Sequence, residues 1–425
     1  MELFSRFKRD YLNYLFSIII PVIINAVSIP LFKQLLGSDG YGDFTITFNS
    51  ILLLTAALTG WLTQSIIRFF PSSDCKRNFA KVSLLLITRL QILLAFPCIL
   101  IIIYVKNDWI LGLLYFFTLF ITSMQFTILA LSQSAFLSVK SIYSEIIRSV
   151  SYISTALLFL YFFPQHYLYS LLGAVFISYF LSFVYLFRQT FKNLTHANIN
   201  SALSMPRHYL RKFLSYGAPL SLWFVCAYLI SYMDKLFLFR FSGPSIQGDY
   251  QAVFDLLSKS ITALISPVIF SLFPLLTSAW QSGDRESAQK LIQRILRIEA
   301  AAFVLALAMY FLFGAEWLFK ITRVEYTLQN LLSGALIIGG TFLWQMAMVV
   351  HKKYELSMNT RFLLIMVSFS ALAQFILYLI AGNIHPLVYP AGFLLASGMY
   401  LFLVSVGIKP TGKKQIELQV KNQNS

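Results

Sequence analysis

Long apolar segments follow one another along this chain, and each is long enough to cross a lipid bilayer. About 20 residues of helix cross the hydrocarbon layer. Only 12% of the residues are charged, whereas a soluble globular domain has about 25%. The sequence therefore predicts an all-α integral membrane protein with twelve transmembrane helices. Their approximate ranges are 11–36, 44–70, 79–105, 109–134, 143–163, 167–187, 214–241, 249–279, 296–320, 328–350, 361–381 and 386–407.

The positions of the lysines and arginines predict which loops face the cytoplasm. With a cytoplasmic N-terminus, 25 of the 33 Lys and Arg residues lie in or beside cytoplasmic loops, 5 lie at the outer side and 3 within the spans. Cytoplasmic loops of membrane proteins carry such an excess, so we expect both termini in the cytoplasm. The net charge of +16 then reflects topology and attraction to anionic lipid heads, and no nucleic-acid partner is expected.

A glycine-rich stretch occurs twice, once in each half of the chain. Its residues recur 206 positions later: Gly37, Gly42, Asp43, Phe44, Phe48 and Asn49 match Gly243, Gly248, Asp249, Tyr250, Phe254 and Asp255. Each copy lies between two apolar segments, so we expect a turn in which glycines bend the chain and an acid begins the next helix. Glycine and aspartate also cluster in unrelated loops. The shared register favours a duplicated half, which is a recurrent plan among transporters.

The repeat and the polar segments divide the chain into two halves. We predict a six-helix lobe at 1–188, a cytoplasmic linker at 189–212, a second six-helix lobe at 213–408 and a cytoplasmic tail at 409–425. A further connector, 281–297, mixes apolar and basic residues, which predicts an amphipathic helix on the membrane surface.

Charged residues inside or near the ends of apolar segments are the best indicators of a site. Each costs about 2.5–3.5 kcal/mol at the centre of a membrane helix unless it finds a partner or water. Cations outnumber acids among them, and cations in a cavity of low dielectric attract an anion such as a diphosphate. We expect the cations to bind substrate in a central cavity. The set comprises Arg89, Lys235, Lys259, Arg68 and Lys33, with Asp234 and Asp255 as candidate coupling carboxylates.

Some of these charges have an equally good structural explanation. Asp255 and Lys259 are four residues apart and can pair on one helix face. Lys33 and Arg68 lie near span ends, from which long side chains can reach the lipid headgroups.

A cavity position is favoured more for Arg89 and Lys235. Arg89 has no acid within four residues on its own helix. Asp234 and Lys235 are adjacent, so on a regular helix they point about 100° apart and should not satisfy each other.

The chain offers little for catalysis. Cys75, Cys98 and Cys226 are scattered, and no Cys or His cluster suits a metal. No phosphate-binding loop or paired-acid motif is present, and the outer loops are too short for a catalytic domain, which disfavours a membrane polysaccharide polymerase. We expect no enzyme activity, cofactor or metal.

Taken together, these residues resemble a known family along essentially the whole chain. The shared marks are the proline of the first helix followed by Leu36 to Gly42, Arg68 at the end of the second helix, Tyr216 to Pro219 leading to Asp234 and Lys235, and Gly248 to Tyr250. The pattern is similar to the bacterial polysaccharide-biosynthesis, or O-antigen and capsule repeat-unit, flippases of the multidrug/oligosaccharidyl-lipid/polysaccharide exporter superfamily. Lys235 stands where that family usually has an arginine, which keeps the charge but not the bidentate geometry.

The resemblance implies two pseudo-symmetric six-helix lobes, a MATE-like arrangement, around a central cavity that opens alternately to each side. It implies a flippase that moves an undecaprenyl-diphosphate-linked oligosaccharide from the inner to the outer leaflet of the bacterial cytoplasmic membrane. The implied partners are this lipid-linked oligosaccharide, membrane lipids, a polysaccharide polymerase and glycosyltransferases. The alternative on the same fold is a cation-coupled multidrug antiporter, in which Asp234 or Asp255 would be the essential proton or sodium site.

Overall fold

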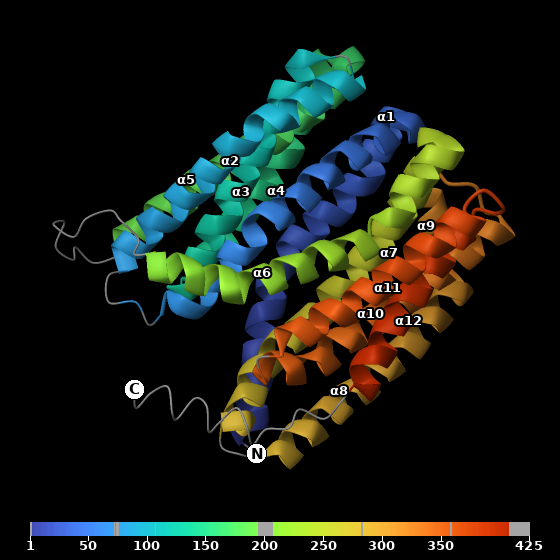
Figure 1. The fold of residues 1–425 in the computed structure, drawn as a ribbon. Helices are drawn as coiled ribbons and strands as arrows, with labels where there is room; N and C mark the ends of the chain where they lie inside the picture. The colour runs from blue at the N-terminus through green and yellow to red at the C-terminus, as the bar shows by residue number, and fades with distance from the viewer. Residues whose placement is uncertain are drawn as a thin grey trace.

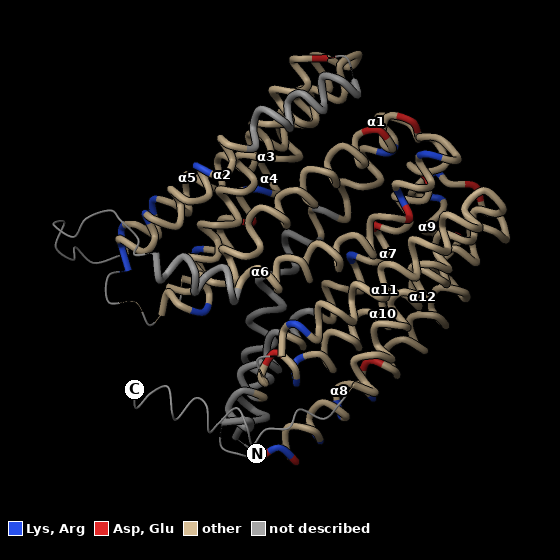
Figure 2. The backbone as a smooth tube through the Cα atoms, in the orientation of Figure 1, with Lys and Arg blue, Asp and Glu red and all other residues tan. Residues whose placement is uncertain are grey.

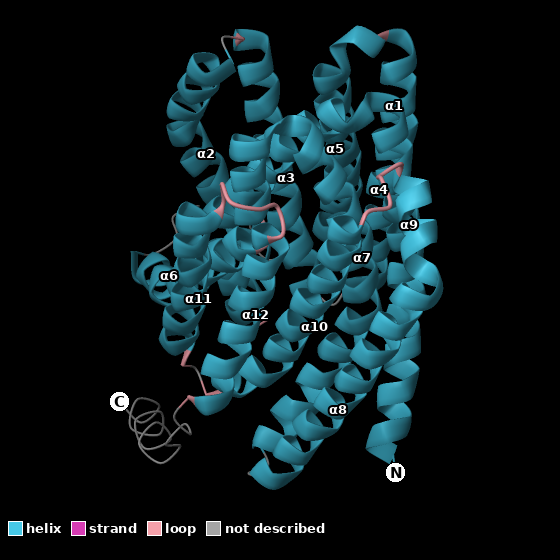
Figure 3. Ribbon diagram, turned by 90° about the vertical axis from the view of Figure 1, so that its right-hand side faces the viewer, coloured by secondary structure: helices cyan, strands magenta, loops and turns pink. Residues whose placement is uncertain are grey.

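In the computed structural model, helices run side by side in two bundles (Figure 1). The structure describes residues 2–71, 73, 76–106, 108–135, 137–193, 207–281, 284–357 and 359–407. None of these residues lies in a strand, and Figure 3 shows how short the loops between helices are. Most of the predicted linker, 194–206, and the whole predicted tail lie outside the described residues.

The first bundle contains most of α1 and the helices up to α5, and the second contains α6 to α12 (Figure 1). The bounds are α1 Glu2–Phe69, α2 Lys76–Lys106, α3 Trp109–Ser134, α4 Ser138–Phe162, η1 Pro164–His166, α5 Tyr167–Asn193, α6 Arg207–Ile230, α7 Met233–Gln281, α8 Arg285–Met309, η2 Tyr310–Gly314, α9 Ala315–Thr322, α10 Leu328–Leu356, α11 Thr360–Ala381 and α12 Val388–Val406.

Two glycines reverse the chain inside the longest helices. Gly37 in α1 has φ 70° and ψ −179°, and Gly243 in α7 has φ 86° and ψ 173°. This backbone region is essentially restricted to glycine. The pair is the first matched position of the sequence repeat, so the predicted duplication has a structural counterpart. We call the end of the molecule that carries both turns the glycine end, and the end where α5 stops and α6 begins the linker end.

The other two matched glycines have a different role from the one we predicted. Gly42 and Gly248 lie within the helices that follow the turns, and they do not bend the chain. A Cβ on Gly42 would overlap the carbonyl oxygen of Pro244, and a Cβ on Gly248 would overlap that of Ser38. Ser38 and Pro244 are themselves 206 residues apart. These glycines therefore allow α1 and α7 to cross in close contact.

Split at the two turns, the described chain forms twelve rods, if α6 is joined to the start of α7 and α8 is joined through η2 to α9. Nine helical segments of the described residues are long and apolar enough to cross a membrane. Two of them, Ala26–Phe69 and Gly217–Ile265, contain a glycine turn, so each includes parts of two rods. The all-α membrane fold predicted from the sequence is confirmed.

Each bundle has its own core. One hydrophobic cluster draws on residues from Ile29 to Leu186, with Ala252 added from α7, and the other on residues from Trp223 to Val404. Apolar burial drives helix association weakly in lipid, where close packing and interhelical hydrogen bonds count for more. Gln125 supplies such bonds in the first lobe, since its amide donates to the hydroxyls of Ser144 (3.0 Å) and Ser182 (2.7 Å) on two other helices.

The predicted surface helix at 281–297 is wrong. Helix α8 begins at Arg285 and continues without interruption to Met309, so the amphipathic segment is the first part of a membrane-crossing rod. Its N-terminus is fixed by Asp284, whose side chain accepts a hydrogen bond from the amide of Ser287 at 3.0 Å. An oxygen-bearing side chain at this position is a common start signal for a helix.

Candidate functional site

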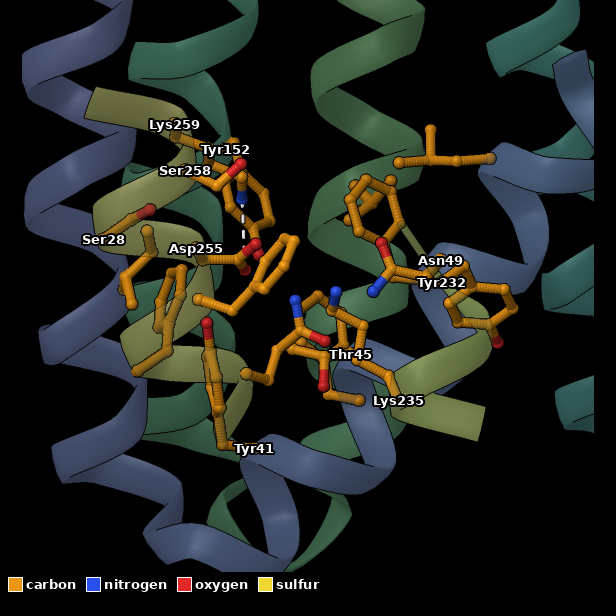
Figure 4. Close-up of a pocket in the computed structure, with 18 of the residues that line it drawn as sticks. Ser28, Tyr41, Thr45, Asn49, Tyr152, Tyr232, Lys235, Asp255, Ser258 and Lys259 are labelled. Carbon is orange, nitrogen blue, oxygen red and sulfur yellow. Dashed lines mark ion pairs between the residues drawn. The ribbon is translucent and has the colours of Figure 1, made fainter. Parts of the chain in front are cut away.

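A cavity of about 320 Å³ lies between the two lobes. It is next to the crossing of α1 and α7, since residues of both helices line it. Its walls come from α1, α4, α5, the end of α6 and α7, so both halves of the chain contribute. In Figure 4, Ser28 of α1 lies on the left beside Asp255 and Lys259 of α7, while Tyr41 and Thr45 of α1 lie below. A site built at the interface of two repeated halves is the arrangement expected of a transporter.

Lys235 lies at a break between α6 and α7. Helix α6 ends at Ile230, a two-residue turn follows, and α7 begins at Met233. The turn leaves the Ser231 carbonyl free to accept a hydrogen bond from the Lys235 Nζ at 2.5 Å. The ammonium also lies 3.0 Å from the centroid of the Phe254 ring, a position in which the negative face of the ring attracts a cation.

Asp234 and Lys235 form an ion pair, and our expectation that these neighbours cannot satisfy each other is wrong. The Lys235 Nζ lies 3.0 Å from Asp234 Oδ2, and both side chains are buried. The expectation assumed a regular helix, but Asp234 occupies the first turn of α7, where an acid suits the positive helix end. Tyr250 donates a further hydrogen bond to Asp234 at 2.7 Å. The Lys235 backbone amide also donates to Asp234, at 2.9 Å. Three groups therefore hold the Asp234 carboxylate.

Asp255 and Lys259 pair as their spacing predicts. Their side chains meet at 3.2 Å, with that of Lys259 57% exposed and that of Asp255 12% exposed. Both line the cavity, and the dashed line in Figure 4 marks the pair. The two residues therefore form an ion pair on one helix and line the cavity at the same time. Lys259 uses one of three N–H donors on Asp255, which leaves donors for a ligand.

Arg148 of α4 also lines the cavity, and it was not among the predicted site residues. Its guanidinium binds Glu145 through Nε at 2.9 Å and through Nη2 at 2.8 Å, and it lies over the Tyr179 ring at 5.2 Å. A guanidinium has five N–H donors, so several stay available. The signal in the sequence was an acid and an arginine three residues apart inside an apolar segment, which places both on one helix face.

The cavity wall is cationic although each cation has a carboxylate partner. Three cations line it, whereas Asp255 is the one acid among the lining residues described. The other two carboxylates, Glu145 and Asp234, stand behind Arg148 and Lys235 and do not line the space. An anion entering the cavity thus meets N–H donors first, and the acids behind them keep those donors oriented.

Three of the predicted cavity cations lie elsewhere. Arg89 is exposed on α2 and Arg68 is exposed at the end of α1, close to the Phe69 ring, and neither lines the cavity. Their positions along the sequence fixed their depth but not the direction in which the side chains point. Lys33 is buried at the glycine end, where its ammonium binds Asp249 of the other lobe and Ser38. It ties the lobes together instead of lining the cavity or reaching lipid.

Tyrosines form much of the remaining wall, and the sequence analysis did not single them out. An aromatic ring with a hydroxyl handle offers both an apolar face and a hydrogen-bonding edge, which matches the mixed surface of a sugar. Tyr228 donates to Asn49 at 3.1 Å and Tyr232 to the Ile46 carbonyl at 2.9 Å, so both link the lobes. The five that line the cavity are Tyr41, Tyr152, Tyr179, Tyr228 and Tyr232.

A second, apolar space of about 870 Å³ adjoins the cavity. It lies between α1, α7 and the rod formed by α8, η2 and α9. On α1, Val27 and Pro30 face this groove while Ser28 and Ile29 face the cavity. On α7, Leu256 and Leu257 face it next to Asp255. The same two helices thus separate a polar space from an apolar one.

The described residues hold no group of three or more His, Cys, Asp or Glu side chains that suits a metal ion. The cavity is therefore best described by its cations, its tyrosines and the adjoining groove.

Several solved transporters share this fold. An inward-facing multidrug resistance MATE family transporter of the MOP superfamily superposes with a TM-score of 0.68 at 14% identity, covering 97% of this chain and 95% of that chain. A MOP superfamily transporter from Pyrococcus furiosus gives 0.70 at 13%, with 99% and 97% covered. A mutant of a Vibrio cholerae MATE transporter gives 0.69 at 11%, with 96% and 97% covered. The protein is a multi-pass membrane protein with the fold of the MATE transporters.

The sequence also matches the model of a particular family, described as polysaccharide biosynthesis protein, over residues 7–280. The chain belongs to this family, as its resemblance in sequence predicted. No individual curated protein matches the sequence. Family and fold together support a membrane exporter or flippase.

Proposed function

We propose that the protein flips an undecaprenyl-diphosphate-linked oligosaccharide from the inner to the outer leaflet of the bacterial cytoplasmic membrane by alternating access. The observation that carries the proposal is a cationic, tyrosine-lined cavity next to an apolar groove, with α1 and α7 between them. The headgroup would enter the polar space while the polyprenyl chain stays in the groove. Transport of this kind makes and breaks no covalent bond.

Arg148 and Lys259 are the residues we propose for contact with the diphosphate. Each lines the cavity and keeps N–H donors beyond those used on its carboxylate partner. Lys235 is more fully engaged, since its ammonium donates to Ser231 and Asp234. We propose that Lys235 supplies a fixed positive field and that the tyrosines contact the sugars.

The cation-coupled multidrug antiporter is less consistent with this wall. A cationic drug would meet three cations there, and each of the acids predicted to couple transport, Asp234 and Asp255, is held by a lysine. The Pyrococcus furiosus transporter is described as having a binding pocket of reverse polarity that suggests a different function. That description fits the view that this fold accepts substrates of different charge.

The orientation we propose puts the linker end in the cytoplasm. Lys and Arg gather at that end of both lobes in Figure 2, whereas Asp and Glu are more prominent at the glycine end. Cytoplasmic enrichment of basic residues is the general rule. Glycosyltransferases that build the substrate would then act on the linker side, and a polymerase on the glycine side. A reporter protein that is active only in the cytoplasm, fused after residue 425, should be active.

Complementation of a flippase-deficient strain tests the function. Charge-assisted hydrogen bonds are worth about 1.5–3 kcal/mol each, so Arg148→Gln combined with Lys259→Gln should lower surface polysaccharide at least about tenfold and cause lipid-linked repeat units to accumulate. Arg89→Gln is the matched control, because Arg89 is exposed outside the cavity. Normal polysaccharide in the double variant, or drug resistance without complementation by the unaltered protein, would refute the proposal.

A further inference from the structure

Glu299 is a buried acid that the proposed transport cycle has not yet used. It belongs to α8, in the membrane-crossing segment Arg285–Thr322. Its residue is only 3% exposed, and neither carboxylate oxygen has a hydrogen-bond partner in the part of the chain that the structure describes. Ionisable residues inside membrane segments are expensive and mark ion pathways or proton relays.

No charged residue lies on the stretches of α7 and α10 that pack against the middle of α8. One turn before it, Ile295 is buried, and one turn after it, Phe303 packs on Phe342 of α10 with ring centroids 5.4 Å apart. Glu299 therefore lies in the stripe of α8 that faces α10 within the second lobe. By sequence, the facing stretches 260–281 of α7 and 328–350 of α10 contain no charged residue.

The titratable groups at the ends of those stretches are bound to other residues. Asp255 pairs with Lys259 on α7, and on α10 both His351 and Lys352 pair with Glu355. The remaining titratable groups on α10, α8 and η2 are Lys353, which lies over the Tyr354 ring, Tyr354, which donates to the Val404 carbonyl, Tyr310, which donates to the Leu331 carbonyl, and the exposed Arg285, Glu286, Lys290, Arg294 and Arg297.

We propose that Glu299 is the binding site for the proton that drives transport. An ionised carboxylate without a partner is costly in such a place, so it takes up a proton and becomes neutral. A proton needs only this one carboxyl, whereas a cluster of acidic ligands for a metal ion is not found around Glu299 among the described residues. This inference rests on the proposed function, to which it adds the driving ion.

The position of Glu299 on its rod links protonation to substrate. Two to three helical turns further on, about 10–17 Å along the axis, Ala306, Met309 and Tyr310 form one wall of the apolar groove. Tyr310 begins the π-helical turn η2, Tyr310–Gly314, and such turns are frequent at functional sites. Loss of the proton would drive Glu299 towards water, so the first part of the rod would leave α10 and α7 and the groove would change shape.

Infrared difference spectroscopy of the purified protein reads the proton directly. The unaltered protein should show the band of a protonated carboxyl that disappears at high pH, and Glu299→Gln should remove that band. Glu316→Gln is the control, since Glu316 is an exposed acid on the same rod, and it should leave the band unchanged. A band that persists in Glu299→Gln would overturn the assignment, as would an ionised carboxylate at neutral pH.

Reconstituted vesicles then test coupling. The probe is undecaprenyl diphosphate that carries one fluorescent sugar, read with an impermeant quencher. A gradient of one pH unit should shift its distribution between leaflets by up to about tenfold per proton, and Glu299→Gln should abolish this dependence, as should Glu299→Met, which keeps the size without the polarity. Gradient-independent movement by the unaltered protein would overturn the inference alone. No movement under any condition would refute the proposed function, and the infrared result would still decide protonation.

Discussion

The two glycine turns have the same backbone but different side-chain partners. Gly37 and Gly243 share their dihedral angles, and each is followed five residues later by a glycine in contact with the other lobe. The acids that come next differ, because Asp249 binds Lys33 across the lobe interface whereas Asp43 accepts a weak bond from Tyr167 at 3.2 Å within its own lobe. The close contact of the two helices is thus the same in both copies of the repeat, whereas the ion pair between the lobes involves the acid of the second copy.

The same divergence continues into the cavity. Asn49 in the first copy corresponds to Asp255 in the second, and Phe44 to Tyr250. Asn49 accepts a bond from Tyr228, whereas Asp255 pairs with Lys259, and Tyr250 helps to hold Asp234. Most of the charge chemistry on the α1 and α7 walls therefore belongs to the second copy, while the first copy supplies polar and aromatic surface.

The largest effect should follow from filling the crossing itself. Gly42→Ala and Gly248→Ala each place a Cβ on a backbone carbonyl of the other lobe, and such overpacking costs about 1–3 kcal/mol. We expect each to lower complementation about tenfold and the double variant to abolish it. Gly398→Ala should be tolerated, because its Cβ would lie 3.4 Å from a Leu343 methyl group, an ordinary contact. A silent Gly42→Ala beside a damaging Gly248→Ala would break the symmetry of the crossing.

A smaller effect should separate the two acids. Asp249→Asn removes the ion pair with Lys33, and a charge-assisted bond is worth about 1.5–3 kcal/mol. The population of the conformation in which α1 and α7 are in contact at the glycine end, which we call the closed conformation, should therefore fall at least about tenfold. Asp43→Asn leaves this ion pair in place and serves as the comparison. Spin labels at Asp39→Cys and Ser245→Cys, with the native cysteines replaced by serine, would measure the distance between the lobes there. Equal shifts for both variants would contradict the asymmetry, whereas restored closure in Lys33→Asp with Asp249→Lys would support it.

The turns themselves should give the smallest difference between the two copies. Gly37 and Gly243 have φ near +70° to +86° with extended ψ, so Ala and Asn alike should cost about 1–3 kcal/mol. Thermal unfolding in detergent should show a similar loss for all four single variants. Arg323, with φ 52° and ψ 39°, is the contrast, since Arg323→Asn occupies the left-handed region that asparagine accepts. Unequal losses at the two glycines would show that only one turn is strained.

The fold could be predicted from the sequence because lipid leaves few choices. Segments of about 20 apolar residues become helices in a bilayer, and the repeat fixed where the halves correspond. The sequence could not show which glycines bend the chain and which allow helix contact. Gly42 and Gly248 must lack a Cβ because the carbonyls of Pro244 and Ser38 lie against them. Those carbonyls approach from the opposite half of the chain.

The site was predicted less completely for a similar reason. Arg89 and Arg148 both lie within predicted apolar segments, yet only Arg148 lines the cavity, because the rotation of each helix about its axis decides this. Lys235 and Lys259 were predicted because they lie inside apolar segments of the sequence. The pairing of Lys235 with Asp234 depends on a two-residue turn after Ile230 that no proline or glycine announces.

The reciprocal contact of Gly42 with Pro244 and of Gly248 with Ser38 has an evolutionary consequence. Under the predicted duplication, Gly42 and Gly248 descend from one position and Ser38 and Pro244 from another, so each contact joins the two positions across the halves. A larger residue at either glycine would require a change in the partner half, and homologues that differ at this junction should differ at both residues of a contact.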